Sequence, residues 1–355
     1  MTRFPHMPLS AASRSAATSR HCFSDPSRRG FLTASLAAAG LLLLPTSLRA
    51  ADPARSSLAA LAFDGDVLLA AGQALVRSDD GGQSWSPLSG PAQILTLATH
   101  PERPGRILAG LAADGIALSE DGGRTWTSRA SGLPAGPTDA LAIAAGQPDM
   151  IYAAIRGDGL WKSEDAGESW SLAMDRPWLD EAERDLLTLA SVDLATGMGG
   201  IWIYAGTEKG LTRLPDCFCR WQDVQPGNAM DALVSGDAPP SEAPLPAGQP
   251  IRALVSAASA PQTLYAALSS GVWTSRDAGV VWSRLAPGDA VSVAVHPTNP
   301  DYIFAAVDGG LKQSRDGGTT WSASSSVIPS VVTWKVGVWW WSIESSSGST
   351  PWVPY

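Results

Sequence analysis

The sequence has few of the residues that mark metal-binding and nucleic-acid-binding proteins. Three cysteines occur in 355 residues, and only Cys217 and Cys219 lie close together. A structural zinc site takes four ligands, so two sulfurs alone are a weak metal signal; we expect neither a metal nor another cofactor. Basic residues number 25 against 34 acidic ones, a net charge of −9. Nucleic-acid binders need a positive footprint, so no nucleic-acid partner is expected.

Long apolar runs and helical periodicity are also scarce. The apolar run Ala34–Leu44 is too short to span a bilayer as a mature helix. After residue 50 no long stretch repeats its apolar residues with the period of an amphipathic helix. Glycine (35) and proline (27) are abundant, while hydrophobic residues make up 45% of the chain. This composition indicates a globular protein with many tight turns.

Residues 1–50 are predicted to be a twin-arginine signal peptide. Arg28 and Arg29 stand in the stretch S-R-R-G-F-L, the apolar run follows, and small residues at Ala50 and Ala51 offer a cleavage site. The alternative is a chance arginine pair before a hydrophobic anchor. The signal predicts export of an already folded chain to a periplasm or lumen.

The rest of the chain repeats one motif, S-x-D-x-G-x-[ST]-W, which is clearest at Ser119, Asp121, Gly123, Thr125 and Trp126. Short polar side chains bond nearby backbone groups, glycine allows a tight turn, and the tryptophan is expected to pack under that turn and open the next strand. One aspartate offers too few oxygens for calcium, so the motif is interpreted as structural. Its six copies carry Asp80 and Trp85, Asp121 and Trp126, Asp165 and Trp170, Asp216 and Trp221, Asp277 and Trp282, and Asp316 and Trp321.

The motif spacing predicts the fold. Successive tryptophans lie 41, 44, 51, 61 and 39 residues apart, and each repeat holds four short apolar or β-branched runs. We therefore expect an all-β protein, a β-propeller of six four-stranded blades over residues 55–322. The tail, residues 323–355, is rich in Trp and Ser; it could be a ring-closing strand that completes a seventh blade, a membrane contact or a non-native reading frame.

The repeated motif resembles the Asp-box, or BNR, repeat of sialidases, sortilin-type receptors and photosystem assembly factors. Together with the export signal, the chain looks like the Ycf48-type factors, which help to build photosystem II on the lumenal side. This resemblance implies a non-catalytic scaffold or assembly factor that binds a protein partner, including a membrane complex. The acidic chain has no evident arginine patch, which departs from that group and favours a more general periplasmic role.

A glycosidase is the main alternative, and a carbohydrate- or small-ligand-binding propeller is another. Sialidases share the box but use an arginine triad and a tyrosine nucleophile. No F-R-I-P-like stretch occurs in residues 51–77, and Tyr152, Tyr204 and Tyr265 share one repeat position that suits the core. Asp-box xyloglucanases use two carboxylates in a larger, two-propeller chain. We therefore expect no catalytic residues.

Two long connections break the repeat and are candidate binding loops. The first, residues 175–185, contains an aromatic residue among mixed charges; the second is the proline-rich stretch Pro226–Pro250. In a propeller, such connections share a face with the turns between second and third strands, opposite the boxes. The alternative is that Trp178 packs on its own blade. The predicted partner-binding residues are Trp178, Asp180, Glu181, Arg156, Asp158, Glu208 and Lys209.

Two smaller motifs are interpreted as structural. His100-Pro101 and His296-Pro297 stand at equivalent repeat positions, which favours turns over metal ligation. Cys217 and Cys219 are either two small apolar residues on a hairpin or, in an oxidising compartment, a local disulfide.

Overall fold

The structure is a computed structural model that describes residues 58–72, 74–113, 115–194, 200–224 and 243–325. The predicted signal peptide and the tail after residue 325 lie outside these residues, as does most of Pro226–Pro250. Every regular element in the described part of the chain is a β-strand, and this part holds no helix long and apolar enough to cross a membrane.

Twenty-four of the strands form six four-stranded antiparallel sheets, each built from consecutive strands. The first three blades are β1 (Ala60–Asp64), β2 (Val67–Ala71), β3 (Leu75–Ser78) and β4 (Ser86–Leu88); β5 (Ile94–Thr99), β6 (Ile107–Leu111), β7 (Ile116–Ser119) and β8 (Thr127–Ser128); and β9 (Thr138–Ala144), β10 (Gln147–Ile155), β11 (Gly159–Ser163) and β12 (Ser171–Met174). The last three are β15 (Thr188–Val192), β16 (Trp202–Gly206), β17 (Leu211–Pro215) and β18 (Gln222–Asp223); β19 (Ala253–Ala257), β20 (Ala260–Leu268), β21 (Gly271–Ser275) and β22 (Ser283–Ala286); and β23 (Ala290–His296), β24 (Asn299–Val307), β25 (Gly310–Ser314) and β26 (Ser322–Ser325).

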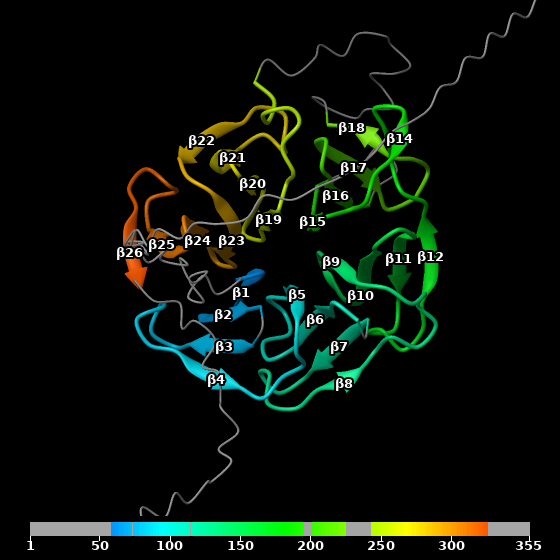
Figure 1. The fold of residues 1–355 in the computed structure, drawn as a ribbon, viewed down its shortest axis with the longest axis horizontal. Helices are drawn as coiled ribbons and strands as arrows, with labels where there is room; N and C mark the ends of the chain where they lie inside the picture. The colour runs from blue at the N-terminus through cyan, green and yellow to red at the C-terminus, as the bar shows by residue number, and fades with distance from the viewer. Residues whose placement is uncertain (1–57, 73, 114, 195–199, 225–242, 326–355) are drawn as a thin grey trace, which may run out of the picture. The chain divides into compact units, whose positions relative to one another are not determined.

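The six sheets surround one axis as a β-propeller, with β1, β5, β9, β15, β19 and β23 innermost (Figure 1). Blade six packs directly against blade one: the Leu61 amide donates to Ser292 Oγ at 3.0 Å, and Ser324 Oγ donates to the Gly81 carbonyl at 2.8 Å. Phe63 and Tyr302 pack across the same seam. The ring is therefore complete with six blades, as the motif spacing predicts.

The core lies between blades because each sheet packs on both faces. Every residue of β6 and β16 is buried. This burial on both faces explains why the sequences of these second strands are apolar without alternation. Tyr152, Tyr204 and Tyr265 are fully buried at equivalent positions of their blades. Burial raises the pKa of all three phenols. These tyrosines are core residues, which removes them as nucleophile candidates.

The intact motifs form hydrogen-bonded turns. In blade two the Asp121 carboxylate accepts from the Thr125 hydroxyl at 2.6 Å and the Thr125 amide at 2.9 Å. The Ser119 hydroxyl donates to Asp121 and accepts from the Gly123 amide, both within 2.9 Å. Hydrogen bonds, led by the Thr125 hydroxyl, lower the pKa of Asp121 to about 2. These four hydrogen bonds of the Asp121 and Ser119 oxygens all lie within the turn, which supports the structural interpretation.

The box tryptophans differ from the prediction in two respects. Each lies just before the fourth strand rather than opening it; Trp126, for example, precedes β8. Only Trp282 is fully buried, at 4% exposure, while the other five are half-buried. The box turn sits at the outer rim of its blade, so one face of the indole packs inward while the other meets solvent.

The two smaller motifs are turn elements. His100 Nδ1 accepts from the Glu102 amide at 3.2 Å, and His296 Nδ1 accepts from the Thr298 amide at 3.4 Å. Cys217 and Cys219 form a disulfide, so the interpretation as two free apolar side chains is wrong. Among the described residues, no group of three or more His, Cys, Asp and Glu side chains is placed to hold a metal.

Candidate functional site

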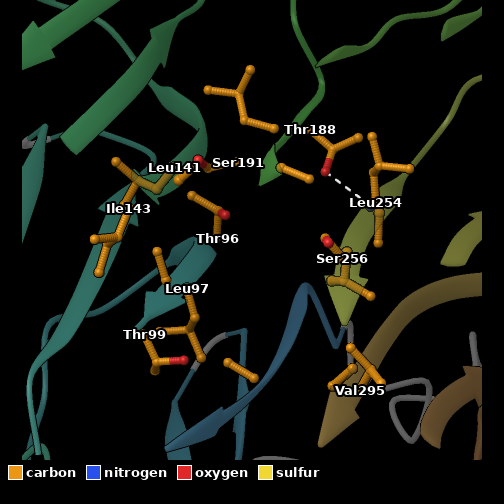
Figure 2. Close-up of a pocket in the computed structure, with 18 of the residues that line it drawn as sticks. Thr96, Leu97, Thr99, Leu141, Ile143, Thr188, Ser191, Leu254, Ser256 and Val295 are labelled. Atoms are coloured by element: carbon orange, nitrogen blue, oxygen red, sulfur yellow. Dashed lines mark hydrogen bonds between the residues drawn. The ribbon is translucent and has the colours of Figure 1, made fainter. Parts of the chain in front are cut away.

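The inner strands enclose a central cavity of about 390 Å³ (Figure 2). Small and apolar side chains line it, among them Thr96, Leu141 and Val295. The hydroxyls at its wall join neighbouring blades: Thr188 Oγ1 accepts from the Leu254 amide at 3.0 Å, drawn as the dashed line in Figure 2. The hydroxyls of Ser191 and Ser292 join blades in the same way, since they accept from the Ala145 and Leu61 amides, each at 3.0 Å.

Charged residues occur at the ends of this cavity. Arg252 pairs with Asp289 at 2.6 Å, and Asp139 is bound by Arg156 at 2.5 Å. Each of these charges is neutralised by a neighbour. The surface of the ring is the stronger candidate for binding, because it carries a tryptophan that is 68% exposed.

The ring has two unlike faces. The box face carries the six box turns and the turns between first and second strands. The connecting face carries the links between blades and the turns between second and third strands. Backbone hydrogen bonds join these two sets: the Arg156 amide donates to Pro137 at 3.0 Å, and the Ile251 amide donates to Thr207 at 3.1 Å. This pairing places Arg156, Asp158, Glu208 and Lys209 on the connecting face, as predicted.

The link between blades three and four folds into a hairpin on that face. Its strands are β13 (Trp178–Leu179) and β14 (Ala182–Glu183), joined by Asp180 and Glu181. Both turn residues have positive φ, 50° and 61°, the pattern of a two-residue type I′ turn. Neither is a glycine, so the turn carries backbone strain that the surrounding contacts must offset.

Ion pairs fix the hairpin to two blades. Arg176 pairs with Glu183 and, at 3.2 Å, with Asp185. Asp185 also accepts from the Gly157 amide of blade three at 2.9 Å. On the other side, Lys209 of blade four lies 3.6 Å from Asp180. The hairpin is thus tied at its base and near its tip, and of the predicted residues Asp180 and Lys209 lie beside each other.

Trp178 stands exposed on this anchored hairpin. Its exposed fraction is 68%, the largest among the exposed large hydrophobic residues that the structure describes, with Leu172 at 51% and Val281 at 43%. The alternative that Trp178 packs on its own blade is therefore wrong. Of its predicted companions, Asp158 is engaged within blade three, where it accepts from Trp161 Nε1 at 3.0 Å.

Sequence reasoning missed the residues that hold the hairpin, Arg176 and Asp185. Both were visible within the charged stretch 175–185, but no spacing rule links an arginine to carboxylates seven and nine positions later. The pairing depends on the type I′ turn, which reverses the chain and brings Glu183 back beside Arg176.

Comparisons with known proteins agree with the fold. The BNR/Asp-box repeat model matches residues 76–87. No curated protein sequence matches the chain. The GH74 enzyme of Niastella koreensis has a similar structure, with 17% identity over 75% of this chain and 45% of that chain and a TM-score of 0.52. The repeat and the six blades together define the class: the chain is an Asp-box β-propeller.

Two further solved structures extend the comparison. A chain of the COPII outer coat vertex on membranes shares 10% identity over 77% of this chain and 71% of that chain, with a TM-score of 0.51. YCF48 bound to D1 peptide shares 16% identity over 79% and 85%, with a TM-score of 0.43. This chain spans about half the length of the GH74 enzymes, 47% for that of Xanthomonas campestris. At such identities the likeness describes a shared fold.

Proposed function

We propose that this protein is an exported, non-catalytic propeller that binds a protein partner through the β13–β14 hairpin of its connecting face. Within that role it acts as a scaffold or assembly factor for a periplasmic or membrane complex. One observation carries the proposal: a tryptophan with 68% exposure on a hairpin that ion pairs hold in a strained turn.

The physical argument concerns preorganisation. Burying an exposed indole against a partner removes a large apolar surface from water, and tryptophan is enriched among residues that dominate binding energy. Because the contacts of Arg176 and Asp185 already order the hairpin, little entropy remains to be lost on binding. The charged rim of Glu181, Glu208 and Lys209 suits the polar border of an interface.

Export is supported by two independent features. The twin-arginine pattern at Arg28 and Arg29 predicts it, and a disulfide between Cys217 and Cys219 suits an oxidising compartment. Replacing both arginines by lysine is expected to leave unprocessed precursor in the cytoplasm. Normal processing and export of that variant would refute the twin-arginine route.

Site-specific photocrosslinking in cells tests the binding face. A crosslinker at position 178 of the full chain is expected to give one discrete adduct. The matched controls are Leu172, exposed on β12, and Val281, exposed on the box face. If adducts form equally at all three positions, or only at 281, the hairpin is not the interface.

A carbohydrate ligand is the second candidate, because an exposed indole also stacks on sugar rings and because the propeller shares its fold with a GH74 enzyme. Titration with xyloglucan oligosaccharides distinguishes the two. Saturable binding that is lost in Trp178→Ala, without any protein adduct at position 178, would favour the carbohydrate.

A further inference from the structure

The blade-four turn keeps Asp216 and Trp221 of the box but lacks its serine, glycine and hydroxyl residues. Leu214 stands where the other copies have serine, and Arg220 stands at the hydroxyl position. Phe218 occupies the glycine position and has φ 52°, while the corresponding glycines, such as Gly123 at 86° and Gly318 at 90°, adopt this region freely. The Cys217–Cys219 disulfide brackets Phe218. A covalent bridge therefore spans the position that is glycine in the five intact boxes.

The bridge is not the main anchor of this turn. It closes a loop of only three residues, which constrains the unfolded chain little. Phe218 packs against Tyr152 at 6.0 Å between ring centroids, and Lys162 Nζ lies 5.2 Å from the Phe218 ring centroid. Trp221 Nε1 donates to the Asp175 carbonyl at 2.7 Å. These contacts do not involve sulfur, so the turn can keep its place when the bridge opens.

Three features make the bridge reactive. Both cysteines are exposed, so an attacking thiolate can reach either sulfur. The residue between them is an aromatic held at positive φ, a strain that an open bridge can release. Arg220 follows Cys219 directly in the sequence and adds a positive charge beside the bridge in the chain, a charge that favours a thiolate. Exposed and strained disulfides are the labile and catalytic ones, in contrast to buried structural bridges.

We propose that Cys217 and Cys219 form a thiol–disulfide exchange site that oxidises dithiols of other exported proteins stoichiometrically, one dithiol per chain; this inference rests on the export proposed above. A substrate thiolate attacks Cys217 Sγ, the bond between the two cysteines breaks, and Cys219 leaves as a thiolate beside Arg220. The second substrate thiol loses its proton to water and attacks the substrate sulfur of the mixed disulfide, which releases Cys217. The substrate gains one disulfide, and two electrons pass to the chain, which ends as a dithiol.

Equilibration of the full chain with glutathione tests the proposal. Every sample carries Cys22→Ser, so that only the pair titrates. After alkylation, mass spectrometry counts free thiols and circular dichroism follows the fold. We expect reduced glutathione to open the bridge with the β-spectrum unchanged, and the oxidised chain to convert a peptide dithiol probe to its disulfide one for one. A bridge that glutathione leaves closed, or that opens only as the chain unfolds, would overturn it.

Two variants separate exchange from a merely structural bridge. Phe218→Gly removes the positive-φ strain and is expected to shift the equilibrium toward the disulfide on the order of tenfold. Cys219→Ser should form one stable mixed disulfide with glutathione at Cys217 and oxidise no dithiol. If Phe218→Gly leaves the equilibrium unchanged and Cys217 of the second variant stays unmodified, the site does not exchange.

Discussion

The two faces of the propeller are built on opposite principles. On the box face, five copies of one turn repeat two hydrogen bonds: the serine hydroxyl donates to the aspartate and accepts from the glycine amide, from Ser78 in blade one to Ser314 in blade six. On the connecting face, the link between blades three and four folds into the β13–β14 hairpin, the one two-stranded sheet among the described residues. Repetition marks what every blade needs in order to fold. Under the proposed function, the departure from repetition marks the surface that binds a partner.

This contrast makes separable predictions. Changes on the box face should lower the free energy of unfolding and leave partner binding intact in the folded fraction. Changes at the exposed hairpin should weaken binding and leave unfolding nearly unchanged.

The largest effect on stability is expected at Trp282, the one fully buried box tryptophan. Its Nε1 donates to the Gly279 carbonyl at 2.8 Å, and Ala would leave both a cavity and an unpaired carbonyl. Trp282→Ala should cost about 3–5 kcal/mol of unfolding free energy in denaturant titration. The half-buried Trp126→Ala should cost less. Equal losses at the two sites would contradict the observed difference in burial.

A smaller effect is expected at the box glycine of blade two. Gly123 has φ 86°, and a Cβ there would lie 2.8 Å from Leu88 Cδ1. Gly123→Ala should therefore cost about 1–3 kcal/mol. Its neighbour Gly122 also has positive φ, but a Cβ there would meet only Arg77, at 3.8 Å. Gly122→Ala is thus the matched control; a larger loss at 122 than at 123 would show that packing beneath the turn does not matter.

The smallest effect is the response of the box turns to acid. In four boxes, hydrogen bonds from the Ser or Thr hydroxyl, followed by other bonds, lower the aspartate pKa from 3.8 to about 2. Because the folded-state pKa is the lower one, this stabilisation is complete above the unfolded value and is lost as pH falls from 3.8 toward 2. The thermal midpoint should fall in that window, and less steeply in Asp121→Asn. Identical slopes for variant and parent would contradict the role given to this carboxylate.

The repeat explains why so much of the fold was predictable. A box fixes its turn through residues at most four positions apart, so its sequence pattern suffices to locate the turn, and the spacing then gives six blades. The repeat also made it possible to predict the core position shared by Tyr152, Tyr204 and Tyr265.

Contacts between distant segments were not predictable. The ring closes through Leu61 and Ser292, which are 231 positions apart. The partial exposure of the box tryptophans depends on how the outer rim of each blade packs. For the candidate site, the loop and its face could be inferred from blade topology. The hairpin and its Arg176 anchor could not, because they depend on a type I′ turn in which Glu181 stands at the position that usually requires glycine.

The central claim, that the hairpin presents Trp178 to a protein partner, is tested most directly by titrating the crosslinked partner against matched variants. Trp178→Ala should weaken the complex by about 2 kcal/mol, roughly 30-fold, with an unchanged melting temperature. The matched control is Leu172→Ala, which removes another exposed large hydrophobic side chain, on β12 of blade three. This variant should bind the partner like the parent chain. Equal affinity of Trp178→Ala and the parent chain would contradict the claim.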